Sequence, residues 1–174
     1  MSSARGLPNN QFFGRVKWRW MVIREAKHGD EWGIWNAHTR AITQVSSLEY
    51  PEEVLAELLR PEPVSNIEAI EGVQIFVAEI DHQIVGFGSI RIQSSEIEVM
   101  IVDPDFMRQG IGQKLMERLE TVAIDAGLER LIVGSSVYGQ PFYRACGFAD
   151  IGIRNRTGHR MGVEFQEHLM EKLL

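Results

Sequence analysis

A glycine-containing turn in the middle of the sequence has the residue types that bind phosphate groups. The apolar run that ends at Val102 is followed by Asp103-Pro104, by Arg108, and then by Gly110 and Gly112 at the start of a helical pattern. Unpaired N–H groups and the dipole at a helix start attract an anion, and glycine lets that anion approach the backbone closely. The turn therefore predicts a pyrophosphate site, to which Arg108 adds a positive charge. The alternative is that the two glycines only permit a tight turn.

Two well-known phosphate-binding patterns do not fit this turn. The dinucleotide-binding fingerprint requires a third glycine at position 115, where the chain has Leu115. A P-loop requires Gly-Lys followed by Ser or Thr, and the sequence does not contain that tripeptide. A plain nucleotide-binding domain is therefore disfavoured.

Two glutamates on the strand before this turn are candidates for acid–base chemistry. Because side chains on a strand alternate between its faces, the residues of this strand divide into two sets. We expect Glu96, Glu98, Met100 and Val102 on one face and Ile97, Val99 and Ile101 on the other. A carboxylate on the first face could remove a proton from an attacking amine. The alternative for either glutamate singly is a solvated strand face.

The elements that position these residues follow from apolar periodicity and from turn residues. Runs of branched and aromatic residues predict strands, and apolar positions spaced three and four apart predict helices. The expected strands are 21–25, 73–80, 83–92, 97–102, 130–133, 148–153 and 162–172. The expected helices run from Asp30 to Val45, Pro51 to Leu59, Gly110 to Ala126 and Gln140 to Ala145. Tight turns are expected at 81–82 and 155–158.

This order of elements, β-α-α-β-β-β-α-β-α-β-β, predicts a single domain of the α/β (α+β) class over residues 21–174. The expected architecture is a mixed, mostly antiparallel sheet of about seven strands with flanking helices. Residues 1–20 contain basic residues and no acidic residue. We expect this segment to be a mobile leader that runs into the fold.

Two ordered motifs resemble the signatures of the GNAT acetyltransferases. Residues 96–104 and 108–115 resemble the strand, turn and helix that bind acetyl-CoA in that family. The family pattern is Gln/Arg-x-x-Gly-x-Gly/Ala, and here Met107 stands at its first position. The second signature is Asn/Ser-x-x-Ala-x-x-Phe-Tyr followed by Gly-Phe, with Gly139 in place of the alanine. Its residues here are Ser136, Gly139, Phe142, Tyr143, Gly147 and Phe148.

The resemblance, which covers roughly residues 21–173, implies a sheet splayed at its middle to admit CoA. It implies that Tyr143 is the general acid that protonates the departing CoA thiolate, with a buried packing tyrosine as the alternative. Glu96, ranked above Glu98, would be the base. Tyr50, which precedes a proline, resembles a feature of a subgroup with small-molecule substrates and would contact the acceptor. The implied CoA-binding residues are Met100, Ile101, Val102, Met107, Arg108, Gln109, Gly110, Ile111, Gly112, Gln113, Ser136 and Phe142.

The composition bears on the partners and the compartment. The formal net charge of −6 disfavours nucleic acid, whose phosphates reward a basic face, and mildly favours a cationic amine. The single cysteine, Cys146, excludes an internal disulfide, and no cysteine or histidine cluster has metal-ligand spacing. No apolar run approaches the length of a membrane span. We therefore expect a cytoplasmic protein without a metal site or membrane attachment.

These observations favour an N-acetyltransferase that moves acetyl from acetyl-CoA directly to a primary amine of a small molecule. A protein or peptide N-acetyltransferase is one alternative, and an acyl-CoA-binding sensor of the same fold without turnover is another. Four tryptophans lie close together near the start of the chain, at positions 18, 20, 32 and 35, and predict a packed aromatic group. An exposed part of that group could mark the surface of a homodimer.

Overall fold

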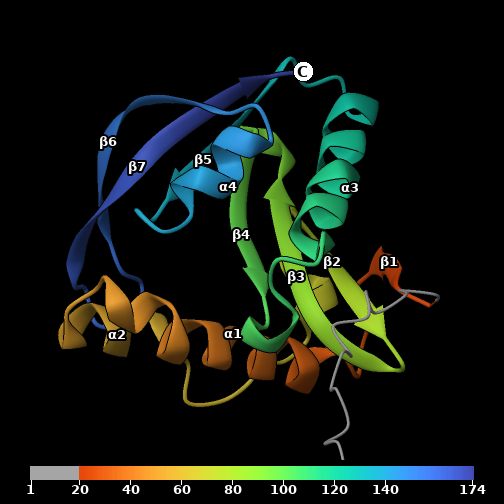
Figure 1. Cartoon of the computed structure of the whole chain (residues 1–174), viewed down its shortest axis with the longest axis horizontal. Coiled ribbons are helices and arrows are strands. Elements are labelled where there is room, and N and C mark those ends of the chain that lie inside the picture. The colour runs from red at the N-terminus through yellow and green to blue at the C-terminus, as the bar shows by residue number, and fades with distance from the viewer. Residues whose placement is uncertain (1–19) are drawn as a thin grey trace, which may run out of the picture.

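The computed structural model describes residues 20–174, which form seven strands and four α-helices (Figure 1). The expected leader, 1–20, lies outside the described residues apart from Trp20. The strands are β1 (Val22–Glu25), β2 (Val73–Ile80), β3 (Gln83–Arg91), β4 (Glu96–Val102), β5 (Arg130–Ser135), β6 (Ala149–Thr157) and β7 (Glu164–Leu173). The α-helices are α1 (Glu31–Gln44), α2 (Glu52–Leu58), α3 (Ile111–Asp125) and α4 (Gln140–Ala145). The predicted order of elements is confirmed.

The strands form one mixed sheet in the order β1-β2-β3-β4-β5-β7-β6. Neighbouring strands are antiparallel except for β4 and β5, which are parallel. These two strands pair only where Glu96 lies opposite Ile132 and Ile97 lies opposite Val133. Beyond these pairs they diverge, so the sheet is splayed at its middle. The expected domain with a seven-stranded, mostly antiparallel sheet is confirmed.

Helices cover both faces of the sheet (Figure 1). On one face, α3 buries Leu115 and Leu119 in the main core, together with Met170 of β7. On the other face, Ala37 of α1 packs in a second core with Phe87 of β3. Each fully buried large aliphatic or aromatic side chain contributes about 1.5–3 kcal/mol. The two cores therefore hold the helices firmly against the splayed sheet.

Three turn and helix-capping features were expected from the sequence, and two of them are present. Asp81 and His82 have φ values of 48° and 63°, as a two-residue hairpin of type I′ requires. Gly127 ends α3 with φ of 75°. Asp30 occupies the N-cap position of α1, but its side chain does not cap the helix. Its carboxylate instead pairs with Arg24 of β1 at 2.6 Å, because that guanidinium lies beside it.

The alternation predicted for β4 is wrong, because the strand contains a bulge at Glu98. Val99 lies opposite Ser89 of β3, while Ile97 lies opposite the next residue of that strand, so Glu98 is the extra residue. Ile97, Met100 and Val102 pack in the core beneath α3, and Val99 and Ile101 pack in the core beneath α1. Met100 and Val102 therefore do not share a face with Glu96.

The turn expected at 155–158 is also wrong, because β6 continues through Thr157. Asn155 lies opposite Gln166 of β7, and the Asn155 Oδ1 atom accepts a hydrogen bond from the Gln166 Nε2 group at 3.1 Å. Cross-strand contacts of this kind outweigh the turn preference of the local sequence. The hairpin reverses at 158–163 instead.

Two of the four tryptophans pack against each other. The rings of Trp32 and Trp35 meet edge to face, with centroids 5.7 Å apart. Trp20 is 70% exposed, and Trp18 lies outside the described residues. The homodimer stays a prediction.

Among the helices of residues 20–174, none has the length and apolarity that crossing a bilayer requires.

Candidate active site

The turn between β4 and α3 directs backbone N–H groups out of the helix end. Arg108 and Gly110 have φ values of 61° and 84°, and these left-handed residues lead the chain into the first turn of α3. The N–H of Lys114 donates to the Gly110 carbonyl at 3.1 Å. The amides ahead of this bond belong to Ile111, Gly112 and Gln113. Together with the helix dipole, they form a site suited to an anion.

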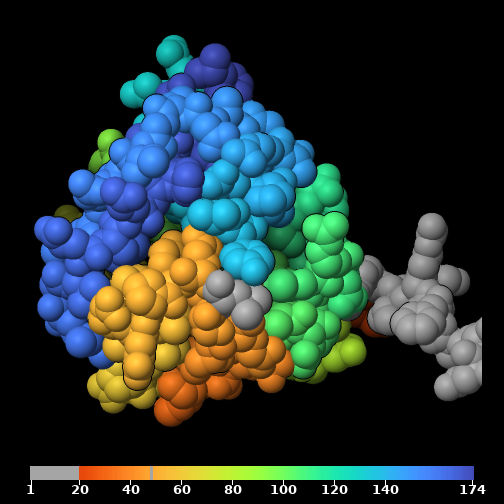
Figure 2. All heavy atoms as spheres, turned by 60° about the vertical axis from the view of Figure 1, so that its left-hand side comes forward, coloured from red at the N-terminus to blue at the C-terminus, as the bar shows by residue number. Residues whose placement is uncertain are grey.

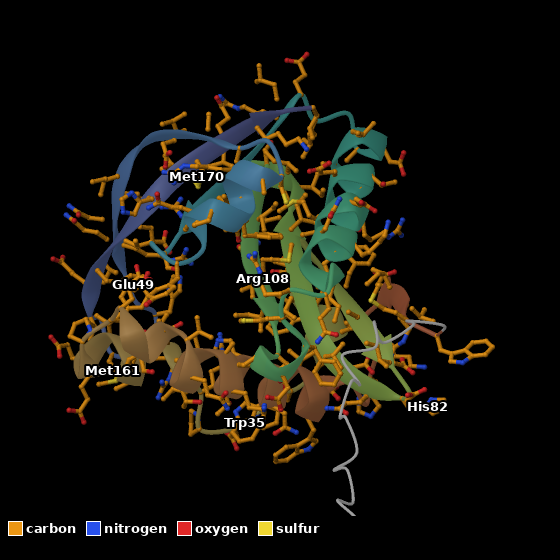
Figure 3. All side chains as sticks on the ribbon, viewed as in Figure 1. Trp35, Glu49, His82, Arg108, Met161 and Met170 are labelled. Atoms are coloured by element: carbon orange, nitrogen blue, oxygen red, sulfur yellow. The ribbon has the colours of Figure 1, made fainter. Side chains whose placement is uncertain are left out.

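The residues around this turn hold it in place and leave a cation at its surface. The N–H of Met107 donates to the Pro104 carbonyl at 3.3 Å, and the Gln109 side chain donates to the Asp105 carbonyl at 3.1 Å. Arg108 is exposed and has no ion-pair partner within residues 20–174. Figure 3 shows it near the amino-terminal end of α3. The turn thus offers an unneutralised positive charge.

Gly112 is needed because the ring of Phe142 in α4 packs directly against it. A Cβ atom at position 112 would lie 3.0 Å from the Phe142 Cε2 atom, which is closer than ordinary contact. The absence of a side chain therefore lets α4 approach the start of α3. This packing places Phe142 beside the anion-binding turn.

The splay leaves one edge of β4 without a partner strand. Residues 100–102 pair with β3 on one side, whereas the pairing of β4 with β5 ends at Ile97. The backbone groups of 100–102 that point away from β3 are therefore available to an extended ligand, which could bind as an added strand.

Ser136 fixes the loop that follows β5. Its Oγ atom accepts a hydrogen bond from the N–H of Gly139 at 3.1 Å. Its carbonyl accepts hydrogen bonds from the N–H groups of Gly139 at 3.1 Å and Gln140 at 3.2 Å. The hydroxyl oxygen is thus an acceptor in the first turn of α4, while its hydrogen can still be donated.

Tyr143 is a buried phenol that keeps its proton. Its ring packs edge to face on Phe142 and Phe148, at centroid distances of 5.2 and 5.6 Å. Burial raises the pKa of Tyr143 well above its usual value, and the charges of Cys146 and Glu167 raise it further. Within residues 20–174 the hydroxyl has no hydrogen-bond partner. The group is therefore protonated at neutral pH and free to donate.

Glu96 belongs to a cluster of charges that crosses β5. The Arg154 Nη2 group of β6 donates to Glu96 Oε1 at 2.7 Å and to Glu167 Oε2 of β7 at 2.8 Å. Arg156 lies 3.3 Å from the other oxygen of Glu167. A Cβ atom on Gly134 of β5 would lie 2.2 Å from Glu167 Oε2, so glycine is required beneath this cluster.

Glu98, the second candidate base, has different neighbours. Its Oε1 atom accepts a hydrogen bond from the Nε group of Arg91 in β3 at 2.6 Å. The same guanidinium donates to the Glu71 carbonyl at 3.0 Å. Glu98 is therefore paired on the β3 side of the strand, whereas Glu96 reaches over β5.

Sequence reasoning missed Glu167 and Arg154. Glu167 is only 8% exposed, yet in the sequence it stands in the closing strand without a motif around it. The available signal was Gly134, the only glycine in β5, because a glycine inside a strand often marks the close approach of other groups.

Tyr50, the predicted acceptor contact, lies beside the same cluster. Its ring meets that of Phe165 edge to face, with centroids 6.1 Å apart. Burial raises the pKa of Tyr50 to about 12, with further contributions from the charges of Glu49 and Glu167. Tyr50 and Tyr143 are thus both influenced by the carboxylate of Glu167.

Two carboxylates bind the α1–α2 region to distant backbone. Glu49 accepts hydrogen bonds from the N–H groups of Val137 at 2.6 Å and Tyr138 at 3.3 Å, in the loop after β5. Buried Glu57 of α2 accepts from the N–H groups of Arg160 and Met161, each at 2.6 Å, in the β6–β7 turn. Figure 2 shows the orange atoms of this region lying against the cyan atoms of the loop after β5. The α1–α2 region, which we call the roof, is therefore fixed to the loop after β5 and to the β6–β7 turn.

Cys146 does not have the surroundings of a nucleophile. It lines a groove of about 270 Å³ between α3 and α4, together with Phe142 and Lys172. Burial raises the pKa of the Cys146 thiol, and the Glu120 charge raises it further. A thiol in this environment is mostly protonated at neutral pH, which is unfavourable for nucleophilic attack.

Comparison with known families now identifies the chain. The family model described as "Acetyltransferase (GNAT) domain" matches residues 41–173. The chain belongs to the GNAT acetyltransferase family. It is therefore an acyl-CoA-dependent N-acetyltransferase, and the turn, splay and phenol described above lie within the matched residues.

Curated relatives of this GNAT acetyltransferase include proteins with different printed names. It is 30% identical over 129 residues to the uncharacterized N-acetyltransferase YafP of Escherichia coli, covering 74% of this chain and 81% of the relative. It is 36% identical over 87 residues to the IAA acetyltransferase of Azospirillum brasilense, covering 46% and 57% of the two chains. These names do not agree on one acceptor.

Solved structures share the fold of this GNAT acetyltransferase. A GCN5-related N-acetyltransferase from Rhodopseudomonas palustris superposes with a TM-score of 0.77 at 22% identity, covering 88% of this chain and 95% of the other. The yncA protein of Salmonella typhimurium, solved with acetyl-CoA, superposes with a TM-score of 0.61 at 20% identity, covering 88% and 94%. Within residues 20–174 of the present chain, no group of three or more acidic, histidine or cysteine side chains is arranged for a metal ion.

Proposed function

We propose that this GNAT acetyltransferase transfers an acetyl group from acetyl-CoA directly to a primary amine of a small molecule. One observation carries the proposal. Glu167 shares the Arg154 guanidinium with Glu96, and its charge also raises the pKa of Tyr143. This supports the pairing of a protonated acid, Tyr143, with a carboxylate base, Glu96, that have Glu167 as a common neighbouring charge.

In this proposal, the anion-binding turn and the free edge of β4 hold CoA. The amides of 111–113 and the Arg108 guanidinium bind the pyrophosphate. Met107, Gln109 and Gly110 shape the turn. The backbone of 100–102 binds the pantetheine arm as an added strand, Ser136 donates its hydroxyl hydrogen to that arm, and Phe142 packs beside it.

The reaction removes one proton from nitrogen and delivers one to sulfur. An ammonium group has no lone pair, so Glu96 takes a proton from the acceptor before or during attack. The nitrogen then bonds to the thioester carbonyl carbon, whose oxygen is stabilised by a backbone N–H of β4. The carbon–sulfur bond breaks, and the thiolate receives the phenol proton of Tyr143. A free thiol and a phenol have ordinary pKa values of about 8.5 and about 10, so positioning must assist this last step.

The roof supports a small acceptor. Glu49 and Glu57 tether the α1–α2 region to the loop after β5 and to the β6–β7 turn, and Tyr50 lies within the tethered region. A region tethered at both places favours a small acceptor over an extended peptide. The name of one relative, IAA acetyltransferase, also points to a small molecule.

The test is release of CoA, followed with a thiol reagent, from acetyl-CoA and a panel of amines, polyamines, amino acids and short peptides. We compare the wild type with Glu96→Gln and with Glu98→Gln, a matched control on the same strand. Turnover of a small amine that is lost in Glu96→Gln and kept in Glu98→Gln supports the proposal. Turnover of peptides alone would assign a protein acceptor, and acetyl-CoA binding without turnover on any acceptor would assign a sensor.

We also propose that the protein works in the cytoplasm. Cys146 is the only cysteine of the chain and cannot form an internal disulfide, which supports a reducing compartment. Fractionation of the native cells, with an antibody against the chain, tests this; recovery from the membrane or the medium would contradict it.

A further inference from the structure

The splay between β4 and β5 is enclosed by contacts that lie far apart in the sequence. At one end the two strands are joined by their parallel pairing at Glu96 and Ile97. At the other end the strands have diverged, and α1 with the segment after it spans the distance between them (Figure 1). Each end of that span is fastened by side chains.

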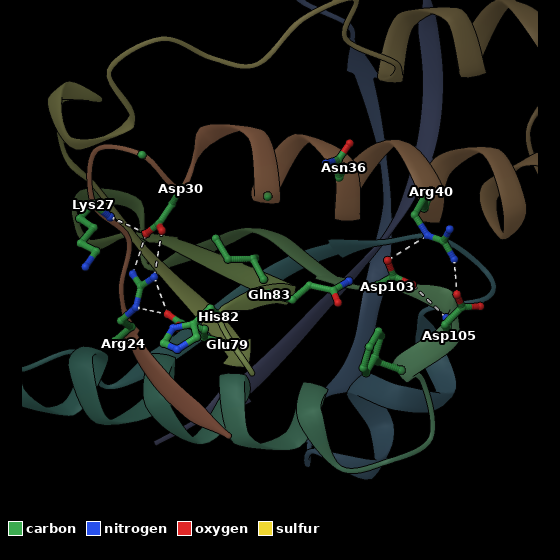
Figure 4. A pocket seen from close by; sticks show the side chains of 14 residues that line it. Arg24, Lys27, Asp30, Asn36, Arg40, Glu79, His82, Gln83, Asp103 and Asp105 are labelled. Carbon is green, nitrogen blue, oxygen red and sulfur yellow. Dashed lines mark hydrogen bonds and ion pairs between the residues drawn. The ribbon is translucent and has the colours of Figure 1, made fainter. Parts of the chain in front are cut away.

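The first fastening joins α1 to the end of β4. The Arg40 Nε atom lies 2.9 Å from Asp103 Oδ2, and Arg40 Nη2 donates to Asp105 Oδ2 at 2.5 Å. Asp103 follows β4 directly and is buried. Figure 4 shows these two pairs at one side of a polar cleft of about 620 Å³. The helix is thereby held against the turn that precedes the anion site.

The second fastening joins the segment after α1 to the loop after β5. It consists of the two bonds that the Glu49 carboxylate accepts from the backbone of Val137 and Tyr138. Both of these residues are more than half exposed, at 56% and 54%. Water can therefore compete for these bonds, whereas Arg40 in the first fastening is paired with the buried carboxylate of Asp103. The second fastening is therefore the one that opens more readily.

We propose that Glu49 is a latch that closes a ring around the pantetheine arm of a bound acyl-CoA. The ring consists of β4, the Arg40 pairs, α1, Glu49, the loop after β5 and the β4–β5 pairing. This inference rests on the proposed CoA site, because the arm must lie between the two strands. Acyl-CoA can exchange by two routes. Its thioester end can pass through the closed ring, or the whole arm can enter and leave while the Glu49 bonds are open. A small acetyl group can thread, whereas a larger acyl group has to wait for opening.

The test measures exchange rates of two probes by stopped-flow fluorescence. The first probe is CoA labelled on its adenine, and the second is 3′-phosphoadenosine 5′-diphosphate with the same label. The second probe occupies the anion site but has no arm to pass through the ring. We compare the wild type with Glu49→Ala and Glu49→Gln, and with Glu53→Ala as a control on the exposed surface of α2.

We expect Glu49→Ala to raise both the association and the dissociation rates of labelled CoA about tenfold, which corresponds to about 1.4 kcal/mol. The dissociation constant should change less than about twofold, because opening affects both directions. Glu49→Gln, which keeps an oxygen acceptor, should give a smaller increase. The rates of the armless probe should be the same in every variant. In competition experiments with labelled CoA, Glu49→Ala should raise the exchange rate of unlabelled hexanoyl-CoA more than that of unlabelled acetyl-CoA.

Two contrary results are separable. If labelled CoA and the armless probe bind but Glu49→Ala leaves the CoA rates unchanged, the latch is refuted while the CoA site stands. If neither probe binds, the proposed CoA site itself is refuted. If both probes speed up equally in Glu49→Ala, the variant has loosened the anion site, which also refutes the latch. Arg40→Gln provides an independent check. Loosening the other fastening should also raise the exchange rates of labelled CoA and leave the rates of the armless probe unchanged.

Discussion

Replacing Tyr143 by phenylalanine removes a hydroxyl group from a ring that is otherwise packed. The residue is 6% exposed, and its contacts with Phe142 and Phe148 involve the ring and not the oxygen. Within residues 20–174 that oxygen has no hydrogen-bond partner. The oxygen is not among the solvent-excluded polar atoms without a partner, so water can reach it. Its removal breaks no hydrogen bond within the described residues, so we expect the free energy of unfolding of Tyr143→Phe to stay within about 1 kcal/mol of the wild type.

Catalysis, in contrast, should be strongly reduced in Tyr143→Phe. Loss of a general acid lowers kcat by about 100- to 1,000-fold, while the KM for acetyl-CoA should change less than about threefold. Because burial raises the pKa of Tyr143 above its ordinary value of about 10, the wild-type kcat should not fall through loss of this proton below that pH. Steady-state CoA release and urea unfolding measure the two effects on one preparation.

A Tyr143→Phe variant with kcat within about threefold of the wild type would refute the acid role and leave Tyr143 as a packing residue. Tyr143→Ala supplies the contrast. It removes the ring as well, and loss of a buried aromatic side chain costs about 3–5 kcal/mol. A variant that loses activity only when stability is also lost would point to packing.

Three further predictions concern other residues. Burial and the positive charge of Arg60 lower the pKa of His38 from 6.5 to about 4, so the folded state should lose up to about 3 kcal/mol of stability as pH falls through this interval. Urea unfolding across that range should show a smaller loss in His38→Gln. Gly134→Ala should displace Glu167, cost about 1–3 kcal/mol and raise the KM of the acceptor but not of acetyl-CoA. Arg108→Gln should weaken CoA binding about fivefold in calorimetry at low salt and less at high salt, and no salt dependence of that difference would contradict an electrostatic role.

Local patterns were sufficient for the order of elements and for the anion-binding turn. The change of apolar period at Gly110 and the glycine at position 112 predict where α3 begins, because those signals arise from residues adjacent in the chain. The Asp81-His82 turn is of the same kind. Its backbone conformation depends on the turn residues themselves.

The rest depended on contacts between distant residues. The bulge at Glu98 arises from the register of β3 against β4, and no periodicity within β4 marks it. Arg154 and Glu167 meet Glu96 only after four strands, β4 to β7, have assembled. The Glu49 bonds join residues 88 and 89 positions apart in the chain. Side chains of this kind look like ordinary surface glutamates until the fold is known.

The bulge in β4 also has a consequence for how the chain tolerates insertions and deletions. Glu98 is the extra residue opposite β3, so a substitution there alters one side chain, whereas removing the residue would restore a regular ladder. The residues upstream would keep the pairing that they already have, because Ile97 would still lie opposite Ile90 and Glu96 opposite Arg91. Ile97 would stay in the core beneath α3, and Glu96 would stay on the other face. Homologous chains should therefore tolerate loss of the residue at this position, whereas loss of a paired residue on either side of it would turn Ile97 out of the core.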